Sequence, residues 1–443
     1  MASTRKTAPL VSLLRTDDPA CHKHLRKLFT RGETASEHVE RSVRDIITTV
    51  RRQGDRAVCK YTREFDRVRV TSQTLTVSAQ EMDAALEQLS QAERTALRIA
   101  ARRITNFHKK QRQTGWSYRD NLGVTLGQRI APLQRAGIYV PGGKAAYPSS
   151  VLMNVIPAKV AGVKEVIVVS PPSPHGYHPA VLAAARLAGV DAFFRVGGAQ
   201  AVAALAYGTQ TIPRVDKIVG PGNIYVATAK RLVFGQVDID MIAGPSEVLV
   251  IADESASPRD IAADMLSQAE HDELAAPLCV TTSKQVANAV IQAIEEQIVT
   301  LQRKDIAAAS MRQQGAVILA RNRAEVLELA NAIAPEHLEL AVKNPRQWLP
   351  DLHHAGAIFI GHLSTEPFGD YIAGPNHVLP TGGTARFSSP LGVYDFLKRT
   401  NIIEANAHAL KTLGPHIVRL ADMEGLEAHA RAVQYRLNGG KHA

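Results

Sequence analysis

The sequence contains few aromatic residues and few cysteines, and both shortages narrow the classes of protein to consider. Phe, Trp and Tyr make up only 5% of the 443 residues, which is a poor supply for a surface that stacks nucleic-acid bases. The three cysteines, Cys21, Cys59 and Cys279, are odd in number, far apart and without CxxC spacing. A disulfide framework is therefore not expected. We expect the protein to lie in a reducing compartment, the cytoplasm.

Long apolar runs and secretion signals are also absent. No segment approaches the roughly 20 consecutive apolar residues that a membrane-spanning helix needs, so no membrane partner is expected. The start of the chain, MASTRKTAPLVSLLRTDDPA, has no long apolar core and no cleavage site of the A-x-A type, as a secretory signal would. It is free of acidic residues before Asp17, as organellar presequences are, but it is short for that role. We expect residues 1–32 to form an N-terminal arm.

Acidic residues are fewer than basic ones. The sequence has 42 Asp and Glu residues and 52 Lys and Arg residues, which gives a formal net charge of +10. Such an excess attracts anions, whether nucleic acids, phosphates or carboxylates. The basic residues form no long tract, and the nearest clusters are Arg51-Arg52 and RRITNFHKKQR (102–112). We therefore expect no nucleic-acid partner, and a solvated basic face is the alternative explanation of the charge.

Strand-like runs alternate with Ala-rich helical stretches from residue 135 onward. The runs are AGIYV (136–140), VIVVS (166–170), AFFRV (192–196), KIVG (217–220), EVLVIA (247–252), LCVTT (278–282), AVILA (316–320) and AIFI (357–360). This alternation predicts parallel sheets with helices on their faces. We expect an α/β fold with two successive Rossmann-like units, each an incomplete, doubly wound parallel sheet, and a cleft between them.

Helical appendages are expected at both ends of this α/β core. Capping-box patterns occur at TASE (34–37), SAQE (78–81) and SQAE (90–93), so the first 130 or so residues read mostly as helix. A further helix begins at Ser257-Pro258, with Ser as the cap and Pro at the first helical position. The residues after about 390 read as helix again.

Glycines lie where strands of the first unit end, at Gly142-Gly143, Gly197-Gly198 and GPGN (220–223), although the Rossmann pattern G-x-G-x-x-G is absent. Glycine at such a place lets backbone amides approach a phosphate. Ordinary strand-to-helix turns would need the same residues. A dinucleotide, if one binds, binds in a non-standard way.

The segment LSQAEH (266–271) places Gln268 and His271 at neighbouring positions near the end of a helix. A histidine there can complement the helix dipole, or the two side chains can be half of a metal site. The loop FGDYIAGPNHVLPTGGTARF (368–387) adds Asp370, Asn376 and His377, and such long loops often bind ligands. Imidazole and carboxylate ligands together suit zinc and its divalent neighbours.

Two other polar pairs stand out. Glu336 and His337 are adjacent in IAPEHLEL (333–340) and follow a proline, so they lie at a turn or at the start of an element. They can divide two proton transfers between them, or form an ordinary helix start. Glu424 and His429 lie on the helix-like segment MEGLEAHARA (423–432), where they face one cleft or are simply surface residues.

Seven segments together resemble the successive signature motifs of histidinol dehydrogenases, and the resemblance runs from about residue 25 to the C-terminus. The segments are RAGIYVPGG (135–143), RVGGAQAVAALAYGT (195–209), IVGPGNIYV (218–226), IAGPSEVLVIAD (242–253), LSQAEHD (266–272), APEHLEL (334–340) and GDYIAGPNHVLPTGG (369–383). The resemblance implies oxidation of L-histidinol through L-histidinaldehyde to L-histidine with two NAD⁺, the last steps of histidine biosynthesis. It further implies a homodimer with one Zn²⁺ per subunit.

The resemblance also assigns domains and residues. It implies a first α/β domain on the metal and substrate side, formed by residues 33–138 and 246–390. A second α/β domain, residues 139–245, would lie on the NAD side. A C-terminal helical segment, residues 391–443, would reach the partner subunit. The implied metal ligands are Gln268, His271, Asp370 and His429, and the implied proton acceptors are Glu336 and His337. The implied substrate contacts are Ser246, His337, Glu424 and the four metal ligands. The implied NAD contacts are Tyr139, Gln200 and Asn223.

Two further expectations follow from that assignment. Glu424 and His429 would act across the dimer, and Glu270 is not expected to be a ligand. The alternative function is that of a paralogous zinc- and NAD-dependent dehydrogenase acting on another primary alcohol, such as a sulfonated diol. Glu424 favours histidinol, since a sulfonate would need a cation in its place.

Overall fold

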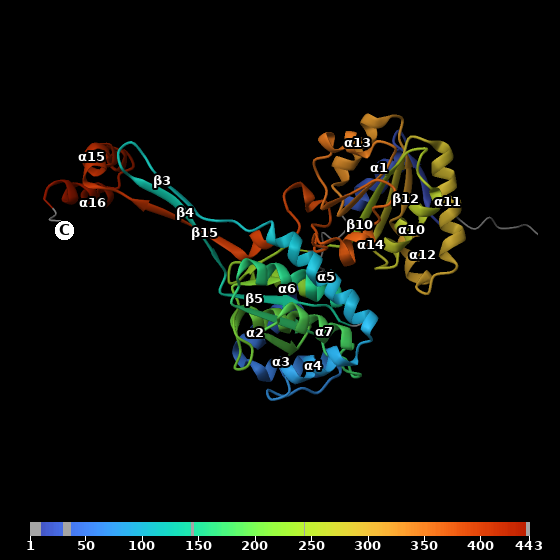
Figure 1. The fold of residues 1–443 in the computed structure, drawn as a ribbon, viewed down its shortest axis with the longest axis horizontal. Coiled ribbons are helices and arrows are strands. Elements are labelled where there is room, and N and C mark those ends of the chain that lie inside the picture. Colours follow the sequence, from blue (N-terminus) through green and yellow to red (C-terminus); the bar gives the residue numbers. More distant parts are fainter. Residues whose placement is uncertain (1–9, 30–36, 143–145, 243, 440–443) are drawn as a thin grey trace, which may run out of the picture. The chain divides into compact units, whose positions relative to one another are not determined.

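The structure is a computed structural model that describes residues 10–29, 37–142, 146–242 and 244–439 (Figure 1). The chain forms two compact units, residues 1–111 with 134–396 and residues 112–133 with 397–443. Each unit is described by itself. None of the described helices is both long and apolar enough to cross a membrane.

The larger unit contains a six-stranded, entirely parallel sheet, called sheet A here. Its strands in spatial order are β1 (Ser12–Arg15), β12 (Ala316–Leu319), β11 (Ala276–Thr281), β10 (Glu247–Ala252), β13 (His337–Ala341) and β14 (Ala357–Ile360). The chain builds outward from β10 to β11 and β12 and then reverses to β13, which is a doubly wound order. The prediction of a parallel, doubly wound unit is confirmed.

Helices cover both faces of sheet A. One face is covered by the helices α10 (Pro258–Ala269), α11 (Lys284–Ile298) and α12 (Lys304–Gln313). The other face is covered by α1 (Pro19–Phe29) and α13 (Arg323–Ile333) (Figure 1). Val248 and Val250 of β10 therefore meet one layer, and Leu249 and Ile251 meet the other. This explains why EVLVIA is apolar at consecutive positions instead of alternating.

A second six-stranded sheet, sheet B, also lies in the larger unit. Its spatial order is β2 (Thr76–Val77), β7 (Ala192–Arg195), β6 (Glu165–Ser170), β5 (Arg135–Tyr139), β8 (Lys217–Val219) and β9 (Asp238–Ile239). All neighbours are parallel except β2 and β7. The connecting helices are α6 (Pro148–Ala161), α7 (Pro179–Ala188), α8 (Gly198–Tyr207) and α9 (Ile224–Val233). The strand order reverses between β5 and β8, so sheet B is the second predicted Rossmann-like unit.

The N-terminal helices pack on sheet B. They are α2 (Glu37–Gln53), α3 (Asp55–Tyr61), α4 (Ala79–Gln88) and α5 (Gln91–Lys109). Residues of α2 and α3 share a buried cluster with β5 and β6, while α4 lies against α7 and α5 against α6. The predicted domain boundaries instead grouped residues 33–138 with sheet A. Helical periodicity defines an apolar stripe, but it does not say which sheet the stripe covers.

The predicted helix starts agree with the structure where it describes them. Ser78 with Glu81, and Ser90 with Glu93, form reciprocal capping boxes. The Ser257 hydroxyl accepts the Asp260 N–H at the start of α10. Most of the predicted box at 34–37 lies outside the described residues.

The smaller unit joins an antiparallel sheet to two helices. Its strands are β15 (Leu397–Glu404), β4 (Thr125–Pro132) and β3 (Trp116–Arg119), and its helices are α15 (Ala407–Met423) and α16 (Glu427–Leu437). The segment predicted as helical, 391–443, therefore contains a strand, β15, that pairs with β4 along its whole length.

Candidate active site and metal centre

The predicted catalytic pair lies at the amino-terminal edge of sheet A. His337 is the first residue of β13, and Glu336 directly precedes it. Ser246 directly precedes β10, which pairs with β13. The helix α10 returns antiparallel to the strands, as crossover helices do, so Gln268 near its end comes back to the same edge. Residues that are distant in the sequence are close in space here, because β10 and β13 begin at this edge of the sheet and α10 ends at it.

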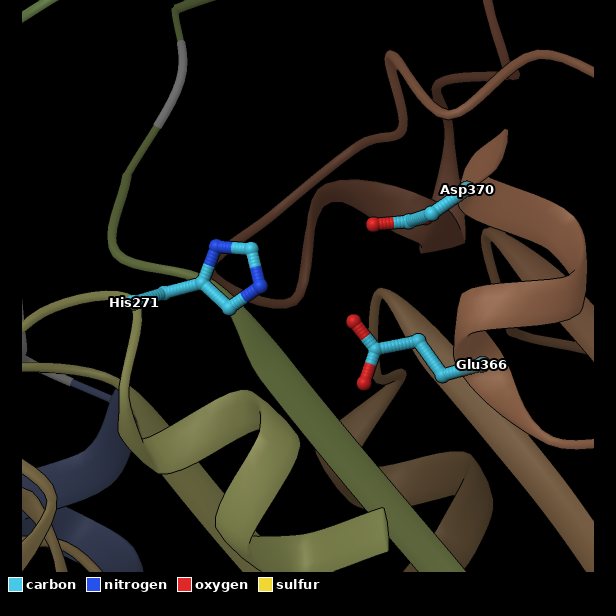
Figure 2. A group of neighbouring side chains, drawn as sticks. All are labelled: His271, Glu366 and Asp370. Atoms are coloured by element: carbon cyan, nitrogen blue, oxygen red, sulfur yellow. The ribbon is translucent and has the colours of Figure 1, made fainter. Parts of the chain in front are cut away.

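A group of possible metal ligands lies at this edge. The ligand atoms of His271, Glu366 and Asp370 all lie within 4.8 Å of one another (Figure 2). Gln268 is 1% exposed, and its Oε1 has no hydrogen-bond partner among the described residues. A buried amide oxygen without a partner is costly unless a ligand satisfies it. With one imidazole, two carboxylates and this amide oxygen, the residues present fit a divalent cation such as zinc.

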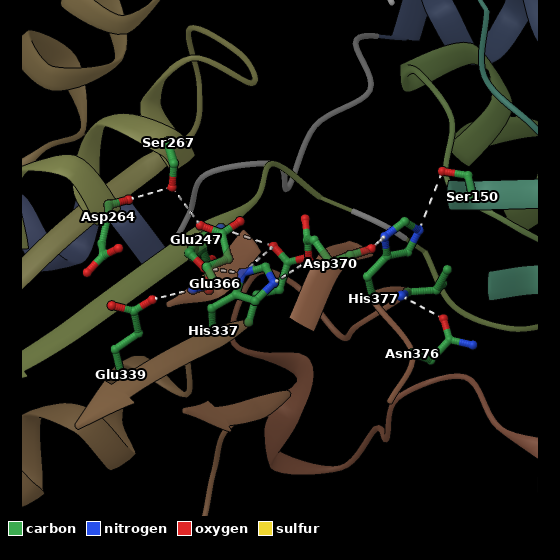
Figure 3. Close-up of polar contacts among 12 residues, drawn as sticks. Ser150, Glu247, Asp264, Ser267, His337, Glu339, Glu366, Asp370, Asn376 and His377 are labelled. Carbon is green, nitrogen blue, oxygen red and sulfur yellow. Dashed lines mark hydrogen bonds and ion pairs between the residues drawn. The ribbon is translucent and has the colours of Figure 1, made fainter. Parts of the chain in front are cut away.

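Glu366 was not among the predicted site residues. It is 2% exposed, and its Oε2 accepts a hydrogen bond from the Ser267 hydroxyl at 3.2 Å (Figure 3). It begins the short helix α14 (Glu366–Phe368), which continues into the π-helix Gly369–Ala373 that carries Asp370. The four-residue spacing between Glu366 and Asp370 is the signal that identifies it, since positions i and i+4 share a helix face.

The environment of His337 fixes which ring nitrogen faces the cluster. Nδ1 lies 3.1 Å from the carbonyl oxygen of Glu247, which can only accept, so Nδ1 carries a proton (Figure 3). Nε2 lies 3.6 Å from Oδ1 of Asp370. In the neutral imidazole the lone pair is therefore on Nε2, aimed toward the metal cluster. His337 is only 3% exposed, so bulk water is largely excluded from it.

Both members of the catalytic pair have perturbed acidities. Burial raises the pKa of Glu336 to about 8 against the pull of the His337 imidazole. Burial disfavours the charged form of His337, but the carboxylates of Glu336, Asp370 and Glu366 outweigh it and raise the pKa of His337 to about 10. Glu336 Oε2 also accepts the Glu247 N–H at 3.1 Å. Titratable groups perturbed by burial and by specific charges are typical of active sites.

The loop that carries Asp370 is tied to the helices of sheet B. His377 Nδ1 lies 3.0 Å from the Asp370 carbonyl oxygen, and His377 Nε2 lies 3.5 Å from the Ser150 hydroxyl on α6 (Figure 3). Asn376 Nδ2 donates to the Met153 carbonyl, also on α6, at 2.6 Å. The predicted functional loop thus links the metal cluster to the other sheet through Asn376 and His377. Sequence reasoning singled out both residues without assigning this task to them.

Two further acids lie behind Glu366. Burial raises the pKa of Glu339 to about 9 and also raises the pKa of Asp264. Glu339 Oε1 accepts the Glu366 N–H at 2.7 Å (Figure 3). Asp264 Oδ1 accepts a hydrogen bond from the Thr365 hydroxyl at 2.6 Å. These contacts hold the start of α14 and so fix the position of Glu366.

A cavity of about 250 Å³ opens beside His337 and Asp370. Its remaining walls are mainly apolar and include Phe359, Phe368 and Leu379. An apolar cavity with a few convergent polar groups is the usual form of a small-molecule site. All of its lining comes from residues 337–379, whereas the sequence led us to expect a cleft between the two sheets.

The predicted NAD contacts lie at the carboxyl-terminal edge of sheet B. Tyr139 ends β5, Gln200 is in the first turn of α8, and Asn223 caps α9 by accepting the Tyr225 and Val226 N–H groups. The Tyr139 hydroxyl accepts the Gly198 N–H at 3.0 Å, which joins β5 to the start of α8. Gln200 is 1% exposed, and its Oε1 has no partner within the described part of the chain. The edge thus offers a buried, unsatisfied oxygen beside a helix N-terminus.

The remaining predicted residues, Glu424 and His429, belong to the smaller unit. Glu424 is the C-cap of α15, and His429 lies in the first turn of α16. Both are exposed within this single chain. Their assignment as substrate contact and metal ligand stays a prediction.

A family model, curated relatives and a solved structure that are similar to this chain are histidinol dehydrogenases. The model of the histidinol dehydrogenase family matches residues 29–437. The histidinol dehydrogenase of Syntrophotalea carbinolica is 58% identical over 97% of this chain and 99% of its own, and that of Pseudomonas aeruginosa is 52% identical over 99% and 100%. A crystal structure of histidinol dehydrogenase from Elizabethkingia anophelis has a TM-score of 0.91 at 35% identity, covering 97% and 99% of the two chains. The chain therefore belongs to the histidinol dehydrogenase family, as the resemblance of its motifs implied.

Proposed function

We propose that this chain catalyses the NAD⁺-dependent, four-electron oxidation of L-histidinol through L-histidinaldehyde to L-histidine, the last steps of histidine biosynthesis. The observation that carries the proposal is the convergence of His271, Asp370 and His337 at one edge of sheet A. Of these residues, His337 and Asp370 line a cavity of about 250 Å³. Family membership supplies the identity of the substrate.

We propose Zn²⁺ as the metal, held by Gln268, His271 and Asp370, with His429 of a second copy as the fourth ligand. Three ligands from one subunit and one from another would make the enzyme an obligate homodimer. Bound zinc supplies Lewis acidity and a template for a substrate with nitrogen donors. Histidinol has two such donors, its imidazole and its amine. Ser246 lies at the same edge and is proposed to contact the substrate.

The first proton transfer is assigned to His337. In the neutral ring the Nδ1 proton is engaged by the Glu247 carbonyl, so Nε2 is the nitrogen that is free to accept the hydroxyl proton as hydride leaves for NAD⁺. Burial and the hydrogen bond to Glu247 hold the ring in one orientation. Such fixed orientation contributes to catalysis because the reacting atoms need not be aligned anew.

The second oxidation is assigned to Glu336. Its raised pKa makes the carboxylate a better proton acceptor than an ordinary glutamate, and it can take a proton from the water that attacks the aldehyde. The resulting hydrate then loses a second hydride to a second NAD⁺. Glu424 of the partner is proposed to pair with the cationic part of the substrate.

The alternative is a dehydrogenase of the same fold that oxidises another primary alcohol, such as a sulfonated diol. The proposed contact of Glu424 with the substrate supports histidinol instead, because a sulfonate would need a cation in its place. A panel of both alcohols separates the two functions.

The test is a count of NADH formed from a limiting amount of L-histidinol. We expect two NADH per histidinol, and a yield of one would remove the aldehyde step. EDTA should abolish this activity while the circular dichroism spectrum keeps its helical signal, since both sheets have full apolar cores without a metal. Unfolding on chelation would make the metal structural instead.

A further inference from the structure

Lys230 and Asp240 form an ion pair that is buried almost completely. The side chains are 2% and 1% exposed, and Lys230 Nζ contacts Asp240 Oδ1. The pair lies at the end of sheet B that carries the predicted NAD contacts, because Lys230 is on α9 and Asp240 directly follows β9. A buried ion pair is not in itself a strong stabilising device, since apolar residues of similar size often do as well. Its presence calls for another reason.

The pair holds both backbone groups of a single residue, Gly220. Lys230 Nζ donates to the Gly220 carbonyl oxygen at 3.0 Å, and Asp240 Oδ2 accepts the Gly220 N–H at 2.8 Å. Gly220 has φ +112°, and a Cβ there would lie 2.1 Å from the carbonyl oxygen of Tyr139. Gly220 therefore lies against Tyr139, the last residue of β5. The oppositely charged side chains of Lys230 and Asp240 hold its carbonyl oxygen and its N–H.

Gly220 opens the GPGN turn, and that turn ends at Asn223. Asn223 is the N-cap of α9, so its direction is set by the path of the turn and by the start of the helix. Lys230 lies on the same helix, two turns further on. A shift of Gly220 would therefore move Asn223 relative to Tyr139, and both are predicted contacts of the dinucleotide.

We propose that Lys230 and Asp240 are positioning residues for NAD⁺: the buried pair fixes Gly220, and through it the spacing between Asn223 and Tyr139 that the dinucleotide needs. This inference rests on the proposed NAD dependence. It goes beyond it in assigning a task to two residues that touch neither cofactor nor substrate.

A second ion pair, between the adjacent strands β8 and β9, supplies a matched control. Lys217 Nζ lies 2.9 Å from Asp238 Oδ2, at the opposite, amino-terminal end of β8 and β9. Asp238 is 52% exposed in its side chain. A substitution there removes a lysine from the same sheet without touching the GPGN turn.

The test compares the wild-type holoenzyme with the double variant Lys230→Met/Asp240→Leu and with Lys217→Met. The double variant removes both charges together, so no unpaired charge is left buried. The dissociation constant of NADH is measured by its fluorescence, together with the KM values for NAD⁺ and L-histidinol, the zinc content and the Tm. We expect the NADH dissociation constant and the KM for NAD⁺ to rise about tenfold or more in the double variant. The KM for histidinol and the zinc content should be unchanged, and Lys217→Met should match the wild type.

A folded double variant with wild-type NADH affinity would overturn the inference, and so would a loss of NADH affinity that Lys217→Met shares. Should the double variant not fold, Asp240→Asn decides by the same measurements, because it keeps an oxygen for the Gly220 N–H but not the charge that holds Lys230. Wild-type affinity in Asp240→Asn would then refute the proposal. A wild-type enzyme that binds no NADH would refute the proposed cofactor itself, and one that binds NADH but leaves histidinol untouched would refute only the substrate.

Discussion

The Nε2 atom of His337 lies 3.6 Å from Oδ1 of Asp370, so the proposed base and a proposed metal ligand are in direct contact. Asp370 is one of the carboxylates that raise the pKa of His337. A cation bound to Asp370 would neutralise that carboxylate and weaken its hold on the imidazolium proton. Metal loading and the proton affinity of the base are therefore linked.

Replacing Glu336 with Gln should separate the two oxidations. The amide cannot accept a proton from water, so aldehyde oxidation should fall by about 100-fold or more, and alcohol oxidation by much less. The half-reactions are measured separately, with histidinol or with supplied histidinaldehyde. Glu328→Gln, on the exposed face of α13, is the control and should match the wild type. Equal losses in both half-reactions would show that Glu336 has no special part in the second.

Replacing Glu366 with Gln should weaken metal binding. Its carboxylate lies with the ligand atoms of His271 and Asp370, so losing its charge should lower the zinc affinity about 10- to 100-fold. The metal-free variant should be no less stable than the wild type, because burial beside Asp370 already disfavours the charged form and raises the pKa of Glu366.

Competition with a chromogenic chelator measures that affinity, and Glu270→Gln is the matched control. Glu270 is the residue next to His271, yet it is absent from the ligand cluster of the described residues. Equal zinc affinities for the Glu366 and Glu270 variants would contradict a role for Glu366 at the metal.

Helices and strands are predicted best where their sequence signal lies within a few consecutive residues. The apolar run 247–252 and the Ser257-Pro258 cap predicted β10 and the start of α10 at their observed positions. The strand β15 was missed because nearly all of its residues are exposed within the chain, so it has no apolar alternation to read. Pairing with β4, which is remote in sequence, makes it a strand.

The metal cluster depends on contacts that no spacing rule connects. Gln268 and His271 share a helix end, but Glu366 and Asp370 reach them only because α10 returns to the edge where β13 begins. The resemblance named Asp370, while the only local signal for Glu366 was its four-residue spacing from Asp370. The same limit explains why the sequence did not assign α2 and α3 to sheet B.

The acidity of Asp66, whose charge acts on the neighbouring Tyr139, predicts a dependence of stability on pH. Burial raises the pKa of Asp66 to about 6, and its Oδ2 has no hydrogen-bond partner among the residues described. Between its ordinary pKa and this value the folded protein holds the proton more tightly than the unfolded chain, so stability falls as the pH rises through that window. Since Asp66 is only partly buried, solvent screening reduces the loss to about 1 kcal/mol.

Asp66→Asn removes that loss. Its Tm should exceed that of the wild type by roughly 2 °C at pH 7.5, and the difference should shrink as the pH is lowered to 5. Scanning fluorimetry at a series of pH values measures both. A difference that stays constant across the series would mean that the ionisation of Asp66 does not limit stability.

The proposed supply of His429 and Glu424 by a second copy can be tested with two variants that are each defective in complete turnover. Glu336→Gln lacks a group of the larger unit, and His429→Asn lacks one of the smaller unit. If each site takes its larger unit from one subunit and its smaller unit from the other, a mixed dimer contains one site with both defects and one with neither. Unfolding and refolding an equal mixture should then restore about one quarter of the wild-type activity for complete turnover, because half of the dimers are mixed and half of their sites are intact. Sites built within single subunits would give no recovery, since every site would keep one defect.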